Sequence, residues 1–115
     1  MTPLITADEC TRLLANGQAR AAGQDTDPLP VVRLFTPDAH ATWLLASLDP
    51  ADGDTAYGLI DLGLGMPDLG TVKLSDLASI VGPLKRPIER DLHFTATRTL
   101  SDYARLARIN GSIID

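Results

Sequence analysis

The sequence predicts an α+β fold: a four-stranded antiparallel meander, with an N-terminal and a C-terminal helix packed on one face of the sheet. Two observations lead to this fold class. Amphipathic segments with helix-capping patterns stand near both ends of the chain, and four apolar, β-prone runs separated by short turns fill the middle. The 115 residues suit one ordinary domain, so residues 1–115 are predicted to form a single domain.

The first helix is predicted from its start signal. Thr6–Glu9 has the spacing of a capping box, in which the first side chain and the fourth each bond to the other's backbone N–H. Apolar residues then recur at helical spacing, which predicts a helix over Ala7–Asn16 with an extension as far as Ala22. Cys10, the only cysteine, lies on the apolar stripe, so we expect a buried, unreactive thiol and no internal disulfide.

The middle of the chain is predicted to form strands, because β-branched and other apolar residues alternate with turn signals. Short connections between successive strands indicate an antiparallel meander, and Asp52-Gly53 is expected to form the tightest of these turns. Trp43, the only tryptophan, stands inside an apolar run and is expected in the core rather than on a stacking surface. The four runs are Val31–Phe35, Ala41–Leu48, Thr55–Leu62 and Leu69–Leu74.

The remaining third of the chain is predicted to be helical at both of its ends. Ser75 is expected to cap a short helix over Asp76–Ile80. The segment Pro83–Phe94 carries two prolines and alternates poorly, so we expect an ordered loop that leads into a short extended piece. A second capping pattern begins at Thr99 and predicts a final helix that ends at Asn110-Gly111.

Composition excludes several classes of function. Aromatic residues are only 4 % of the chain, which is too few for a nucleic-acid platform of stacked rings. The start of the chain lacks a signal-peptide pattern and no apolar run has bilayer length, so we expect a cytoplasmic protein without a membrane association. The carboxylates of Asp49–Asp54 do not fit a calcium loop, and the glycines of Gly63–Gly65 do not open a nucleotide-binding helix. With two histidines and one cysteine, no metal or cofactor site is expected.

Charge is distributed unevenly along the sequence. The net charge is −5, yet residues 83–110 hold six basic and three acidic side chains. This basic part permits contact with nucleic acid, whereas pairing with the chain's own carboxylates is the simpler interpretation. The basic residues are Lys85, Arg86, Arg90, Arg98, Arg105 and Arg108.

Ionisable residues gather in two turns, and these are the candidate binding surface. One interpretation is a loop pinned by salt bridges, with Arg90 reaching Asp38 or Asp61. A second is a binding face formed by the Thr36–His40 turn and the Pro87–His93 loop. A third is catalysis, with Glu89 or Asp91 as acid or base, His93 as its partner and Arg90 holding an anion. The candidate residues are Asp38, His40, Arg86, Glu89, Arg90, Asp91 and His93.

Several short motifs are distinctive: Phe35–Asp38, Thr42-Trp43, Asp61–Gly65, Leu69-Gly70, Leu74-Ser75 and the series from Gly82-Pro83 through Pro87–Phe94. Together they resemble a bacterial family of unknown function whose members are common on plasmids and conjugative elements. The resemblance covers about Leu4 to Phe94. It implies an accessory protein of mobile DNA and brings no catalytic residue with it.

Three functions follow as hypotheses. The leading one is a non-enzymatic interaction module that binds a protein partner through the two polar turns. The first alternative is a nucleic-acid-contacting or antirestriction-type accessory protein that uses the basic part. The second alternative is a small hydrolase-like enzyme that uses Glu89, Asp91 and His93. The sequence does not determine the oligomeric state.

Overall fold

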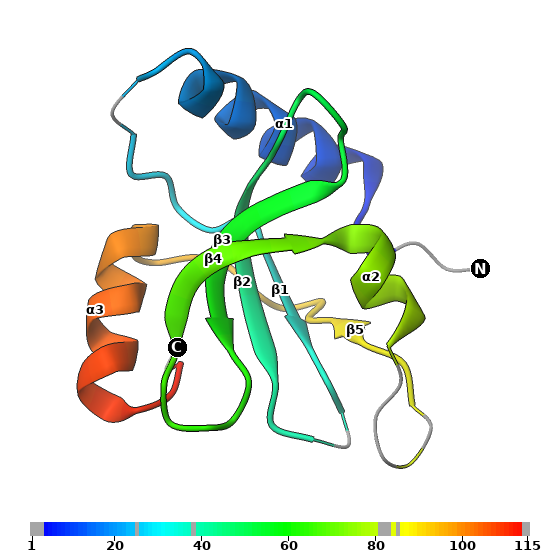
Figure 1. Ribbon diagram of the computed structural model, residues 1–115, viewed down its shortest axis with the longest axis vertical. Helices are drawn as coiled ribbons and strands as arrows, with labels where there is room; N and C mark the ends of the chain where they lie inside the picture. The colour runs from blue at the N-terminus through cyan, green and yellow to red at the C-terminus, as the bar shows by residue number, and fades with distance from the viewer. Residues whose placement is uncertain (1–3, 25, 38, 81–83, 85, 114–115) are drawn as a thin grey trace.

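The computed structural model describes residues 4–24, 26–37, 39–80, 84 and 86–113. Asp38, one of the candidate residues, therefore lies outside the described part. The chain forms an antiparallel sheet flanked by three helices (Figure 1). The elements are α1 (Ala7–Ala21), β1 (Val32–Phe35), β2 (Thr42–Leu48), β3 (Thr55–Asp61), β4 (Asp68–Lys73), α2 (Leu74–Ser79), β5 (Glu89–Arg90) and α3 (Leu100–Asn110).

The α+β class and the antiparallel meander are confirmed, with one added strand. The described strands lie in the order β4-β3-β2-β1-β5, and every neighbouring pair is antiparallel. The four predicted runs form β1 to β4 at almost their predicted bounds. The fifth strand is only two residues long, and it forms because the chain after α2 returns to pair with β1 at the sheet's open edge.

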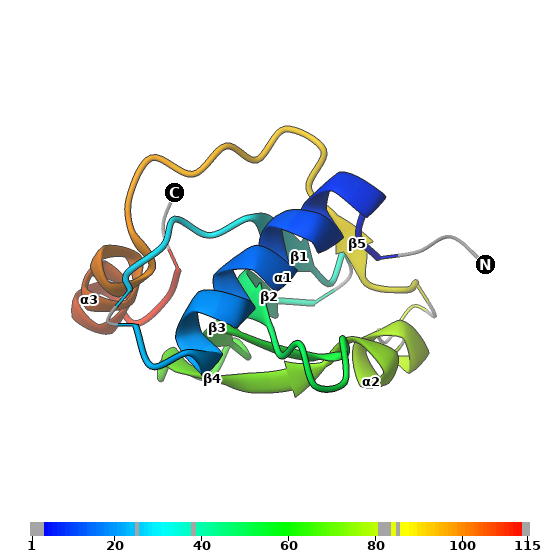
Figure 2. The ribbon, with the colours of Figure 1, turned by 90° about the horizontal axis from the view of Figure 1, so that it is seen from above.

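The two long helices cover opposite faces of the sheet, so the expectation that they share one face is wrong. On the central strand β2, Trp43 and Leu45 point into a core cluster with Leu13 of α1. The intervening Leu44 points into a separate cluster with Tyr103 of α3. Neighbouring residues of a strand face opposite sides, so α1 and α3 must lie on different sides of β2 (Figures 1 and 2). Trp43 is buried in the core, as predicted.

A bulge in β2 fixes the position of α1. The pairing of β2 with β3 shifts between Leu45 and Ser47, which leaves Ala46 out of the ladder. The side-chain amide of Asn16 on α1 donates to the free carbonyl of Ala46 at 2.8 Å. The next residue, Gly17, lies so close to β2 that an added Cβ would stand 1.6 Å from the carbonyl oxygen of Leu48. The helix therefore approaches the strand at a site that only glycine fits.

The helix starts agree with the predictions in part. The capping box of α1 is present, with Thr6 and Glu9 bonded to each other's backbone N–H. Ser75 does not cap α2, which begins at Leu74; its hydroxyl donates to Asp54 instead.

At α3 the cap comes from a distant loop, because Asp27 accepts from the backbone N–H and the hydroxyl of Ser101. These bonds lower the pKa of Asp27 below its usual range.

Candidate functional site

Strand β5 places three of the candidate residues beside β1. Glu89 lies opposite Phe35 and Arg90 opposite Leu34, and the backbone N–H of Asp91 donates to the carbonyl of Arg33 at 2.9 Å. The two strands are antiparallel, so only the Glu89 end of the segment approaches the turn that follows Phe35. The residues beyond Asp91 lead away from that turn along the sheet.

Each ionisable side chain at β5 is engaged by a partner of opposite charge. Arg90 lies 3.5 Å from Glu9 of α1, and Asp91 lies 3.2 Å from Arg33. Arg86 and Glu89 form a more exposed pair at 3.4 Å. The salt-bridged interpretation of this segment is therefore what the structure shows, but Arg90 pairs with Glu9. Of the expected partners, Asp61 has other contacts, and Asp38 lies outside the described residues.

The contacts of Asp91 give little support to catalysis. Its carboxylate accepts from Arg33 and from the backbone N–H of His93, at 3.2 and 2.9 Å. The second bond closes a turn, so His93 does not continue an extended strand beside Asp91 as expected. The His93 side chain is exposed. Within the described ranges no three His, Cys, Asp or Glu side chains are grouped so that they could hold a metal ion.

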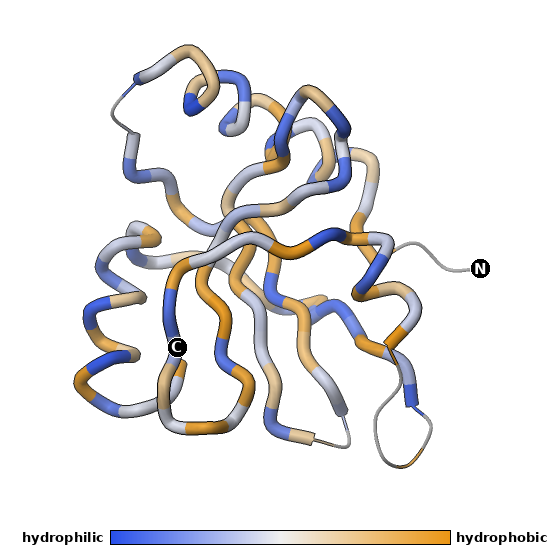
Figure 3. Tube along the Cα trace, viewed as in Figure 1, coloured by the Kyte–Doolittle hydropathy of each residue, from blue (hydrophilic) through white to orange (hydrophobic). Residues whose placement is uncertain are grey.

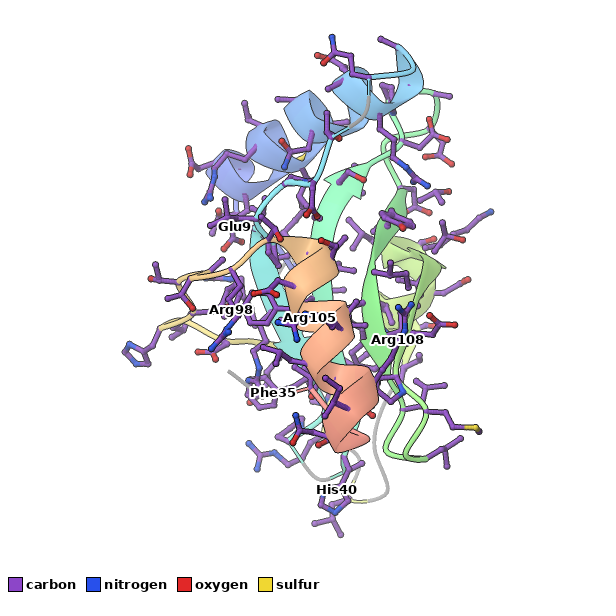
Figure 4. The ribbon with its side chains drawn as sticks, turned by 90° about the vertical axis from the view of Figure 1, so that its left-hand side faces the viewer. Glu9, Phe35, His40, Arg98, Arg105 and Arg108 are labelled. Carbon is purple, nitrogen blue, oxygen red and sulfur yellow. The ribbon has the colours of Figure 1, made fainter. Side chains whose placement is uncertain are left out.

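The basic residues near the end of the chain are also matched by carboxylates. Arg98 and Arg105 both reach Asp102 from either side, at 3.7 and 2.8 Å (Figure 4). Arg108 lies 2.7 Å from Asp68 on β4 and lowers the pKa of that carboxyl. Each described arginine of residues 83–110 thus forms an ion pair with a carboxylate, which reduces the attraction for phosphate.

A polar cavity of about 450 Å³ lies at one end of the sheet, between the segment after α3 and two turns. Arg33, Phe35, His40 and Asp61 contribute to its lining, and Phe35 and His40 are labelled in Figure 4. Asp61 is only 5 % exposed and accepts from the backbone N–H groups of Gly63 and Ile113, at 2.9 and 3.0 Å. One buried carboxylate therefore ties the loop after β3 and the segment after α3 to the same point.

The loop between β3 and β4 presents apolar side chains to solvent beside this cavity. Leu62, Leu64 and Met66 are 58, 72 and 79 % exposed, and the loop stands out as an apolar stretch in Figure 3. Gly63 and Gly65 separate them, both at a φ of +78°, a backbone conformation that favours glycine. The alternation holds the three side chains out of the core.

Two neighbours complete this surface. Gly111, just after α3, lies against Gly65, so the end of α3 stands beside the loop (Figure 1). On the other side, Gly63 packs against His40, where an added Cβ would lie 3.0 Å from the histidine Cβ. We call this surface the apolar rim and define it by His40, Leu62, Leu64 and Met66.

The structure thus brings His40 into the apolar rim, and places Glu89, Arg90 and Asp91 in ion pairs along β1. Sequence reasoning missed the rim, because the alternation of glycine with leucine and methionine over residues 62–66 does not by itself distinguish an exposed loop from a buried turn. Of the described helices, none combines the length and apolar character needed to cross a bilayer.

Comparisons with known proteins identify the family of this chain, and that family has no known activity. Neither the curated proteins nor the solved structures contain a match to this chain. The family model described as "Protein of unknown function (DUF2958)" matches residues 4–114, nearly the whole chain. The chain therefore belongs to this family of proteins of unknown function.

Proposed function

We propose that this protein is a non-enzymatic interaction module that binds a protein partner through the apolar rim. One observation carries the proposal: three large apolar side chains, Leu62, Leu64 and Met66, are each more than half exposed on a single loop. Single exposed apolar residues are normal on protein surfaces, but a group of them with a polar surround marks an interaction site.

The energetics of the rim suit a protein partner. Burying a leucine or methionine side chain fully contributes about 1.5–3 kcal/mol, so the three loop residues together form an anchor for binding. Methionine adapts its shape to a partner better than branched side chains do. Polar groups at the cavity edge, among them His40, supply the hydrogen-bonding border found around the apolar centre of interfaces.

The candidate residues predicted from the sequence differ in how strongly they support a role in binding. His40 belongs to the rim, and the exposed side chains of Arg86 and His93 lie on the β5 side, Arg86 in its ion pair with Glu89. Glu89, Arg90 and Asp91 are half-buried and serve mainly to hold β5. Their ion pairs favour a structural role, and binding through them would require exchange of those partners.

The setting of this function is also a proposal. The motif resemblance implies an accessory protein of plasmids or conjugative elements that acts in the bacterial cytoplasm. A partner encoded by the host or by the mobile element fits a small module with an exposed apolar loop. Nucleic-acid contact has weaker support because the described arginines of residues 83–110 are paired with carboxylates.

The test compares three tagged proteins in capture from host lysate after nuclease treatment. Wild type and Leu92→Asp should retain a stoichiometric protein partner, whereas Leu64→Asp should lose it. Leu92 is the matched control because it is 71 % exposed, against 72 % for Leu64, and lies outside the rim. Retention by Leu64→Asp with loss by Leu92→Asp would instead place binding on the Pro87–His93 loop and overturn the rim. Equal capture by all three proteins would also contradict it.

A further inference from the structure

Strand β4 forms a regular, uncovered edge of the sheet. Among the described strands it pairs on one side only, with β3, and no element lies beyond it in Figures 1 and 2. Its six residues pair with β3 without a register shift, unlike the bulged pairing of β2 with β3. No proline interrupts the strand, since Pro67 precedes it. Such an edge is a template for a further strand.

The direction of the backbone groups along β4 follows from two hydrogen bonds. The N–H of Leu69 donates to the Asp68 carboxylate at 2.9 Å, which points it away from β3. Thr55 of β3 lies opposite Lys73 in the ladder between β3 and β4. The carbonyl of Thr55 accepts from the backbone N–H of Asp49, so it points to the side of β3 that faces away from β4. Backbone directions alternate along a strand, so Leu69, Thr71 and Lys73 present their N–H and C=O groups to the open edge.

We propose that β4 pairs antiparallel with β4 of a second copy of this chain, with the two-fold axis at Thr71. In an antiparallel ladder the outward-facing residues must lie opposite one another. The register that satisfies this condition and uses the whole strand places Thr71 opposite Thr71 of the second copy and Leu69 opposite Lys73. The result is one continuous ten-stranded sheet.

The composition of the edge favours a second copy in this orientation. Asp68, at one end of β4, is held by Arg108 of α3, so Lys73 is the charged residue of the strand that matters for pairing. Antiparallel pairing places Lys73 opposite Leu69 of the second copy, at the other end of the strand from the second Lys73. A parallel arrangement would place like charges side by side. Opposed threonines form favourable cross-strand pairs, and Gly70 offers no side chain that would obstruct the partner strand.

The same edge explains why the association is weak and reversible. The Asp68 carboxylate occupies the N–H of Leu69, and this bond must open before the strands pair at that point. An edge-to-edge contact also buries less surface than most stable interfaces. Dimerisation is therefore expected to depend on protein concentration.

Charge substitutions at the symmetry axis test both the interface and its register. Sedimentation analysis of wild type up to the millimolar range should show a monomer–dimer equilibrium. Thr71→Lys and Thr71→Glu should each remain monomeric, because each places two like charges opposite one another. An equimolar mixture of these two variants should recover the dimer, because the opposed charges are then complementary. Thr11→Lys, at an exposed position on α1, should dimerise like wild type.

A proline variant separates the edge from the fold. Thr71→Pro removes an outward N–H that takes no part in pairing with β3, which edge strands tolerate, so it should stay folded and monomeric. A wild type that is monomeric over the whole range would overturn the proposal. The proposal would also be overturned if Thr71→Lys and Thr71→Glu each dimerised as well as wild type, or if their mixture remained monomeric.

Discussion

Glu9 uses its two carboxylate oxygens for different tasks: Oε1 caps α1 and Oε2 holds Arg90 of β5. Oε1 accepts from the backbone N–H of Thr6 at 2.8 Å, and Oε2 lies 3.5 Å from the Arg90 guanidinium. The start of the first helix and the last strand of the sheet are thereby joined at one residue. This junction explains how a strand of two residues is held at the edge of the sheet.

Substitutions at this junction should have unequal effects on stability. Arg90→Ala removes one partly exposed ion pair, so the free energy of unfolding should fall by about 0.5 kcal/mol. Glu9→Ala also removes one arm of the capping box, and the fall should be about 1.5 kcal/mol. Denaturant unfolding of both variants measures the difference. Equal losses would show that the capping bond contributes nothing.

Gly17→Ala should destabilise the protein although alanine is the better helix former. In an open helix this change would raise stability by about 1 kcal/mol. Here the new Cβ meets the carbonyl oxygen of Leu48 at 1.6 Å, so α1 must move away from β2. We expect a net loss of roughly 1–3 kcal/mol by thermal or denaturant unfolding. Gln18→Ala, next to it and exposed, should stay near wild type, and a stabilised Gly17→Ala would contradict the close approach.

Asp61→Asn should loosen both segments that border the cavity. The amide replaces one acceptor oxygen with an NH₂ group that faces a backbone donor, so one of the bonds from Gly63 and Ile113 is lost. The expected cost is about 1–3 kcal/mol. Hydrogen exchange should be faster at one of these two amides. Asp76→Asn, at an exposed position in α2, is the control; unchanged exchange at both amides in Asp61→Asn would refute this role.

Acid stability should depend in part on Asp52. Hydrogen bonds from the backbone N–H and hydroxyl of Thr55, and from the backbone N–H of Asp54, lower the pKa of Asp52 from 3.8 to about 2. A lowered pKa means that the folded state binds this proton less readily than the unfolded state does. The stabilisation is therefore present above 3.8 and is lost as the pH falls through about 2.

Two measurements check this dependence. The Asp52 carboxyl resonance should titrate near 2 in an NMR experiment on the folded protein. Asp52→Asn should lose stability less steeply than wild type as the pH falls from 3.8 towards 2. A midpoint at the ordinary value for aspartate would show that the turn does not hold the charged form.

Local patterns in the sequence predicted most of the elements, and they failed where tertiary contacts decide. Capping and periodicity located α1, α3 and the four longer strands, but two residues of β5 are too few to show a period. The opposite placement of α1 and α3 had a signal in β2, whose continuous apolar run is typical of a strand buried on both faces. The run by itself predicts a strand, and only the packing of α1 and α3 on β2 shows which helix covers each face.

The candidate site likewise has features that the sequence predicted and features that depend on tertiary packing. The sequence showed that ionisable residues gather around Arg90, but pairing with Glu9 depends on how α1 packs and has no local signature. The apolar rim depends on exposure, which a string of glycine, leucine and methionine does not specify. The same residues over 62–66 would be equally compatible with a buried turn.

The most direct test of the apolar rim is a hydrogen-exchange footprint of the protein in complex with its captured partner. The account predicts that partner binding slows exchange in residues 62–66 and near His40, while Leu92 and its neighbours exchange as in the free protein. Protection confined to the Pro87–His93 loop, with residues 62–66 unchanged, would contradict the proposed interface.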